Sequence, residues 1–76
     1  MTRLPAVSSR VLIKALKSAG FVPIRQSGSH RTLHNPSTNR IVTVPVHSGK
    51  DVASGTLRQV LKDAGLERHE FLELLH

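Results

Sequence analysis

The residue best suited to chemistry in this chain is His30, which directly follows a Gly-Ser pair. Gly28 permits a tight turn and allows a phosphate backbone to approach the main chain closely. The imidazole of a histidine in a model peptide has a pKa of about 6.5. At neutral pH a histidine can therefore accept a proton from a ribose 2′-hydroxyl without a metal. These features make His30 a candidate general base for the cleavage of a phosphodiester bond. The alternative is a surface histidine in a turn.

Basic residues surround this histidine in the sequence. Their guanidinium and ammonium groups suit phosphate oxygens, and they would stabilise the negative charge of a phosphorane-like transition state. Ser29 is better suited to donate a hydrogen bond to a phosphate than to act as a nucleophile. We therefore predict an RNA-binding surface made of Gly28, Ser29, Arg25, Arg31, Arg40 and Lys50.

No metal site is predicted beside His30, and no cofactor is expected. His30 and His34 are four residues apart, which on a strand is roughly 13 Å, too far for two ligands of one ion. Residues 1–50 contain no Asp or Glu that could complete a ligand set. His47 has two open interpretations: an auxiliary acid or phosphate ligand that approaches His30 through the sheet, or a structural hydrogen-bonding residue.

The charge of the chain is unevenly distributed. Residues 1–50 hold eight Lys or Arg and no acidic residue, whereas residues 51–76 hold three basic and five acidic residues. This asymmetry favours a nucleic-acid partner. Because Phe21 and Phe71 are the two aromatic residues, contacts to phosphate and sugar are expected to dominate over base stacking.

Composition excludes several classes of protein. The chain has no cysteine, so it has neither a disulfide framework nor a thiolate metal site. No apolar run approaches the roughly 20 residues that span a bilayer, and the N-terminus lacks the apolar stretch of a signal peptide. We therefore expect a cytoplasmic protein with no membrane partner, folded as a single domain over residues 1–76.

Hydrophobic spacing predicts three helices. The first has apolar residues at helical spacing from Leu12 to Ala19, a cap at Ser8 or Ser9, and an end at Gly20. The second is capped by Ser54 and closed by Gly65. A short last helix covers residues 68–75, and its Phe71, Leu74 and Leu75 either close the core or offer a contact region to a partner.

Three strands are predicted between the first two helices, over residues 21–26, 29–35 and 40–46. Turn residues separate them, which indicates an antiparallel meander, and Pro23 suits an edge strand. The expected fold is α+β, with helices packed on a three-stranded antiparallel sheet. Alternation places His30 and Arg31 on opposite faces of the second strand. If Leu33 points to the core, His30 points to solvent or substrate.

Three motifs then occur in order along the chain. The first runs from Ala19-Gly20-Phe21 to Gln26-Ser27-Gly28-Ser29-His30 and Pro36; the second is Val44-Pro45-Val46-His47 with Lys50; the third covers residues 55–66, followed by Glu70-Phe71-Leu72. At these spacings the set resembles the HicA family, the toxins of bacterial toxin–antitoxin pairs. The resemblance implies a double-stranded-RNA-binding-like fold, α-β-β-β-α with a short C-terminal helix. It also implies metal-independent mRNA cleavage by a histidine at the position of His30, and neutralisation by a cognate HicB-like antitoxin.

Two other functions fit the same residues. A non-catalytic RNA-binding module of the double-stranded-RNA-binding type would bind RNA through the basic strands without cleaving it. A small subunit whose basic face docks an acidic protein would show no affinity for RNA at low salt.

Overall fold

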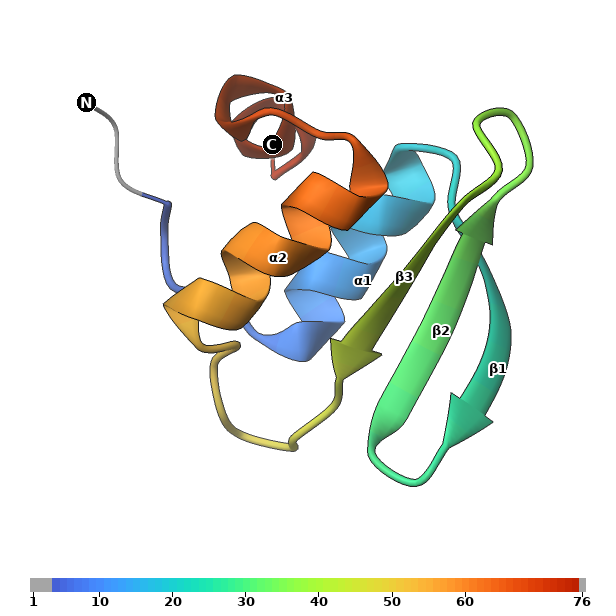
Figure 1. The fold of residues 1–76 in the computed structure, drawn as a ribbon. Coiled ribbons are helices and arrows are strands. Elements are labelled where there is room, and N and C mark those ends of the chain that lie inside the picture. Colours follow the sequence, from blue (N-terminus) through green and yellow to red (C-terminus); the bar gives the residue numbers. More distant parts are fainter. Residues whose placement is uncertain (1–3, 76) are drawn as a thin grey trace.

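The computed structural model describes residues 4–75, which form two layers, helices and a sheet (Figure 1). The elements follow in the order α1 (Ser9–Ser18), β1 (Val22–Ser27), β2 (His30–Asn35), β3 (Arg40–Pro45), α2 (Ser54–Ala64) and α3 (Arg68–Leu74). The predicted α+β fold, with a meander between two helices and a short helix at the end, is confirmed. Each predicted strand lies within about one residue of its observed bounds. No helix of residues 4–75 is long and apolar enough to cross a membrane.

The sheet is antiparallel, in the order β1-β2-β3. β1 is an edge strand, as Pro23 predicts, and its register with β2 shifts between Pro23 and Arg25. Ser27 pairs with His30, so Gly28 and Ser29 alone form the loop between β1 and β2. Gly28 has a φ of 57°, whereas Ser29 has a negative φ. A positive φ at the first loop residue alone is typical of a type II′ turn, whose twist matches that of the flanking strands.

The helices cover one face of the sheet, and the core lies between the two layers (Figure 1). Side chains from each layer are fully buried there: Leu12, Leu16, Leu33, Val42, Val44, Leu57 and Phe71. Leu74 and Leu75 are half-buried against this cluster. The residues of the last helix therefore close the core, as the first of their two expected roles requires.

The helix ends follow the sequence with one exception. Ser8 caps α1, and its Oγ accepts a hydrogen bond from the Val11 amide at 3.2 Å. The prediction that Ser54 caps α2 is wrong, because Ser54 is already the first helical residue. The Leu57 amide donates to the Ala53 carbonyl at 2.8 Å, so the helix begins one residue earlier than its capping chemistry suggests. Gly65 ends α2 in the left-handed conformation with a φ of 73°, as a glycine at this position does.

One buried polar side chain joins the two layers. Asn35, 7 % exposed, lies at the end of β2. Its Nδ2 donates to the carbonyl of Ala19 at 3.4 Å, and its Oδ1 accepts from the Ser37 amide at 2.9 Å. Asn35 thus satisfies the carboxyl end of α1 and the β2–β3 turn together.

Candidate active site and nucleic-acid interface

His30 is the first residue of β2 and lies exposed at one end of the sheet. It pairs with Ser27 of β1 and with Pro45 of β3. Leu33, three residues further along β2, is fully buried against the helices. Because side chains alternate along a strand, His30 projects from the opposite, open face of the sheet. The prediction that His30 faces away from the core is therefore confirmed.

The hairpin before His30 is exposed and is anchored by the main chain. A Cβ added at Gly28 would meet no atom within 4 Å, so space for an approaching backbone is present there. The carbonyl of Ser29 accepts a hydrogen bond from the Val46 amide, which ties the hairpin to the segment after β3. This end of the sheet therefore combines an open approach with a fixed main chain beside His30.

Two of the predicted phosphate-binding cations lie at the same end as His30. Arg25 pairs with Thr32, so it is on the same face as His30 and is its diagonal neighbour across the β1–β2 ladder. Such neighbours have Cα atoms roughly 7–8 Å apart, within reach of a long side chain. Lys50 is exposed and shares a small hollow with Pro45, the residue that pairs with His30.

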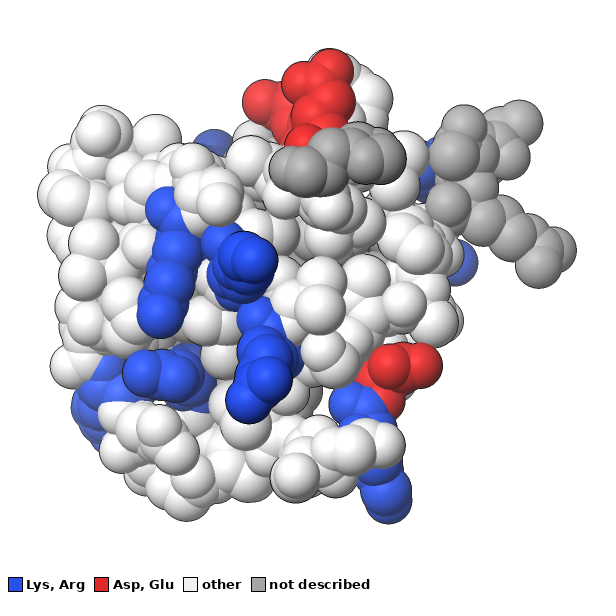
Figure 2. All heavy atoms as spheres, turned by 180° about the vertical axis from the view of Figure 1, so that it is seen from behind, with Lys and Arg blue, Asp and Glu red and all other residues white. Residues whose placement is uncertain are grey.

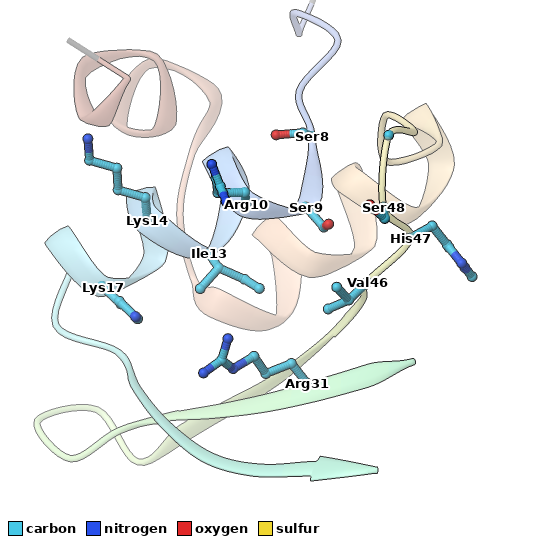
Figure 3. A pocket seen from close by; sticks show the side chains of 11 residues that line it. Ser8, Ser9, Arg10, Ile13, Lys14, Lys17, Arg31, Val46, His47 and Ser48 are labelled. Atoms are coloured by element: carbon cyan, nitrogen blue, oxygen red, sulfur yellow. The ribbon is translucent and has the colours of Figure 1, made fainter. Parts of the chain in front are cut away.

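The other two predicted cations lie elsewhere. Arg31 follows His30 in the sequence but projects from the opposite face, towards α1 (Figure 3). Arg40 begins β3 at the far end of the sheet, five residues from the partner of His30, a distance of roughly 17 Å along a strand. Its Nη1 donates to the carbonyl of Asp63 at 3.3 Å, at the carboxyl end of α2. The four cations thus do not form one surface.

His47 lies in the exposed segment between β3 and α2, two residues after Pro45. Its ring points away from the adjacent groove (Figure 3). Its carbonyl accepts a hydrogen bond from the Lys50 amide at 3.2 Å, so its main chain shapes the turn that carries Lys50.

The structure forms a cationic groove that the sequence analysis missed. Its volume is about 600 Å³, and it lies between α1, β2 and the segment after β3. Arg10, Lys14 and Lys17 of α1 line it together with Arg31 of β2. Figure 2 shows Lys and Arg side chains gathered on the molecule's rear face, with Asp and Glu only at the margins of that view. The sequence feature that could have predicted this groove is the spacing of the three α1 cations, which places them on one side of the helix, away from its apolar stripe.

One cluster of possible metal ligands occurs in residues 4–75, and it does not include His30. Atoms of Glu67, His69 and Glu70 lie within 4.8 Å of one another at the start of α3, and all three residues are exposed. Their contacts explain the cluster without an ion. The Glu67 amide donates to Oε1 of Glu70 at 2.9 Å, as part of a capping box, and His69 Nδ1 lies 3.4 Å from Oε2 of Glu67.

Comparison with known proteins agrees with the fold and with the ordered motifs. A family model described as the HicA toxin of bacterial toxin–antitoxin systems matches residues 9–66, from the start of α1 to just after α2. A search of curated proteins gave no match. The family implies a toxin role and a cognate antitoxin as partner. Because the match covers well over half of the chain, the protein belongs to the HicA family of toxins.

Proposed function

We propose that this toxin is a metal-independent endoribonuclease that cleaves mRNA with His30 as its catalytic residue. The observation that carries the proposal is the position of His30: an exposed imidazole on the open face of the sheet, beside a glycine hairpin, with Arg25 diagonally opposite. Family membership supports the toxin role. Cleavage of mRNA would arrest translation and growth.

In the proposed reaction, His30 accepts the proton of a ribose 2′-hydroxyl. The 2′-oxygen attacks the adjacent phosphorus, the bond from phosphorus to the 5′-oxygen breaks, and the leaving oxygen takes a proton from solvent or from His47. The products are a 2′,3′-cyclic phosphate and a 5′-hydroxyl. Arg25 and Lys50 would neutralise the charge that develops on the phosphoryl oxygens.

The decisive experiment compares His30→Ala with His34→Ala. Both histidines lie on β2 and on the same face, four residues apart, so the second variant is a control for the loss of an imidazole from this surface. Each protein is induced in cells, with growth and full-length mRNA followed over time. We expect His30→Ala to lose at least about 100-fold in cleavage, the usual scale of general acid–base catalysis. His34→Ala should keep the activity. Equal activity of His30→Ala and the wild type would refute the proposal.

Two tests of the purified protein examine the chemistry. Cleavage should persist in excess EDTA, because no metal takes part in the proposed step; complete dependence on added Mg²⁺ or Zn²⁺ would rule this mechanism out. An RNA with a single 2′-deoxyribose on the 5′ side of the scissile phosphate should resist cleavage at that bond, because the nucleophile is missing.

The same measurements separate the rival functions. An RNA-binding module would hold labelled RNA, with wild type and His30→Ala alike leaving it intact. A docking subunit would neither bind nor cleave RNA at low salt. Cleavage that requires His30 excludes both.

We further propose that the antitoxin inhibits by covering His30. The open face that carries His30 also holds Val22 and Ile41, which flank His34 across the sheet, and the bulged edge residue Ile24 lies beside them. These side chains are 51 %, 56 % and 55 % exposed, respectively. Such an apolar surface next to cations suits a protein partner with acidic and apolar groups.

Hydrogen exchange and chemical modification test this proposal on the complex of the toxin with its antitoxin. Binding should protect residues 22–35 and block modification of the His30 imidazole by diethyl pyrocarbonate. If the antitoxin binds tightly and abolishes cleavage while His30 stays as reactive as in the free toxin, direct occlusion is wrong.

A further inference from the structure

The cationic groove lies on the opposite side of β2 from His30. Arg31 and His30 are consecutive, and their side chains leave the strand in opposite directions. The groove cations therefore cannot contact the phosphate that is cleaved at His30 while they remain in the groove. Any anion bound in the groove is therefore not the phosphate that is cleaved.

Three of its cations form a row on α1. Arg10, Lys14 and Lys17 are spaced by four and three residues, so they lie on one side of the helix. The rise of an α-helix separates them by roughly 6 and 4.5 Å along its axis, giving a row of about 10 Å. Arg31 reaches towards this row from the sheet, and Lys17 points down towards Arg31 (Figure 3). One wall of the groove thus carries a row of three cations, and the other wall carries one.

Nothing in the described structure neutralises these four charges. No acidic residue lines the groove, and within residues 4–75 the one ion pair lies on α3, between His69 and Glu67. Holding like charges together without a counter-ion disfavours the folded state, and a bound polyanion would remove that repulsion. The groove also presents Ile13 and Val46 as an apolar surface, and the hydroxyl of Ser9 points into it (Figure 3).

We infer that this groove binds the RNA backbone at phosphates several nucleotides away from the scissile one. The inference rests on the proposed ribonuclease function, because it takes the polyanion to be the RNA substrate. A linear row of cations beside an apolar wall matches a strand whose phosphates alternate with sugars. The RNA would pass from the groove around the Gly28–Ser29 end of the sheet to His30. Arg10, Lys14, Lys17 and Arg31 are then binding residues remote from the reaction.

The test measures RNA affinity in the full-length His30→Ala background, where no substrate is consumed. The probe is a 5′-fluorescein 12-nucleotide RNA, titrated by fluorescence anisotropy between 50 and 300 mM salt, conditions chosen because phosphate contacts are salt-dependent. The groove variant combines Arg10→Gln, Lys14→Gln and Lys17→Gln. The matched control combines Arg58→Gln, Lys62→Gln and Arg68→Gln, which removes the same charge from exposed positions of α2 and α3.

We expect the groove variant to lose at least tenfold in affinity. Its slope of log affinity against log salt should become shallower by about 2, at roughly 0.7 per phosphate contact on a single strand. Arg31→Gln alone should reduce the slope by about 0.7. The control should lose less than threefold, and circular dichroism should show that all variants are folded. The loss in the groove variant should shrink as the RNA is shortened to a dinucleotide, which reaches His30 but not the groove.

Each other outcome has a definite meaning. Equal weakening of the two triple variants would overturn the inference, because total charge and not the groove would then govern binding. A groove variant that binds RNA normally but no longer binds the antitoxin would also overturn it and would assign the groove to the protein partner. If RNA binds in the groove but the wild type does not cleave it, the groove is still an RNA-binding site, but the proposed ribonuclease function fails.

Discussion

Two exposed glycines allow the backbone of the hairpin at His30 to be tested in isolation. Gly28 and Gly55 are alike in that an added Cβ would meet no atom within 4 Å at either position. They differ in conformation, because Gly28 has a φ of 57° in the hairpin, whereas Gly55 is in the first turn of α2 without a positive φ. A change to alanine therefore reports backbone conformation alone at both sites.

The two substitutions should have opposite signs. Gly28→Ala forces a side chain into a left-handed conformation, which costs about 1–2 kcal/mol. Gly55→Ala restricts the unfolded chain and suits a helix, so it should stabilise by about 0.5–1 kcal/mol. In a domain of this size 1 kcal/mol moves Tm by roughly 4–8 °C. Thermal unfolding followed by circular dichroism should therefore give a lower Tm for Gly28→Ala and a higher one for Gly55→Ala.

Gly28→Asn sharpens this comparison, because asparagine tolerates a positive φ better than alanine does. Its Tm should lie between those of the wild type and Gly28→Ala. All these measurements belong in the His30→Ala background, so that expression is not limited by toxicity. If Gly28→Ala and Gly55→Ala shift Tm in the same direction, the assignment of a conformational role to Gly28 is wrong.

Three further predictions concern side chains. Asn35→Leu should destabilise the fold by about 1–3 kcal/mol in urea unfolding, because the two hydrogen bonds to the Ala19 carbonyl and from the Ser37 amide are lost, at about 0.5–1.5 kcal/mol each; an unchanged midpoint would refute this. Leu33→Ala should cost about 2–5 kcal/mol, since this side chain is fully buried, and a loss below 1 kcal/mol would contradict its place in the core. Arg40→Gln should leave RNA affinity in the anisotropy assay within about twofold while lowering Tm, because Arg40 binds the end of α2 and lies far from His30. A large loss of affinity with an unchanged Tm would restore the interpretation of Arg40 as an RNA contact.

The order of the elements and the direction of His30 follow from local rules, which is why the sequence predicts them. Helical spacing and strand alternation report which residues share a face, and Leu33 alone determines the face of the whole second strand. The HicA motifs add the position of the histidine within that pattern. The sequence predicts the cap of α2 at Ser54, but the cap lies at Ala53. The alanine side chain makes no capping hydrogen bond, so the sequence does not indicate that the helix begins there.

The grouping of the cations depends on contacts between distant segments, and proximity in sequence misleads there. Arg31 is one residue from His30 yet lies on the other side of the sheet, and Arg40 is drawn to the end of α2 by the carbonyl of Asp63. Lys14 and Lys17 come far before the histidine in the sequence and join Arg31 only because α1 packs over the sheet. Charge counts therefore predict a basic protein but not which basic residues act together.

His30 and Arg31 project in opposite directions because side chains alternate along the strand. His30 therefore stays on the open face only while an odd number of residue steps separates it from the buried Leu33, a condition of parity. Many side-chain replacements at positions 31 and 32 preserve this parity, but a deletion or insertion of a single codon there reverses it. With Leu33 held in the core, the shorter or longer strand would turn the imidazole towards α1. Over evolutionary time this stretch can change its residues but not its length, whereas the length of the exposed turn at residues 36–39 does not decide which way His30 faces.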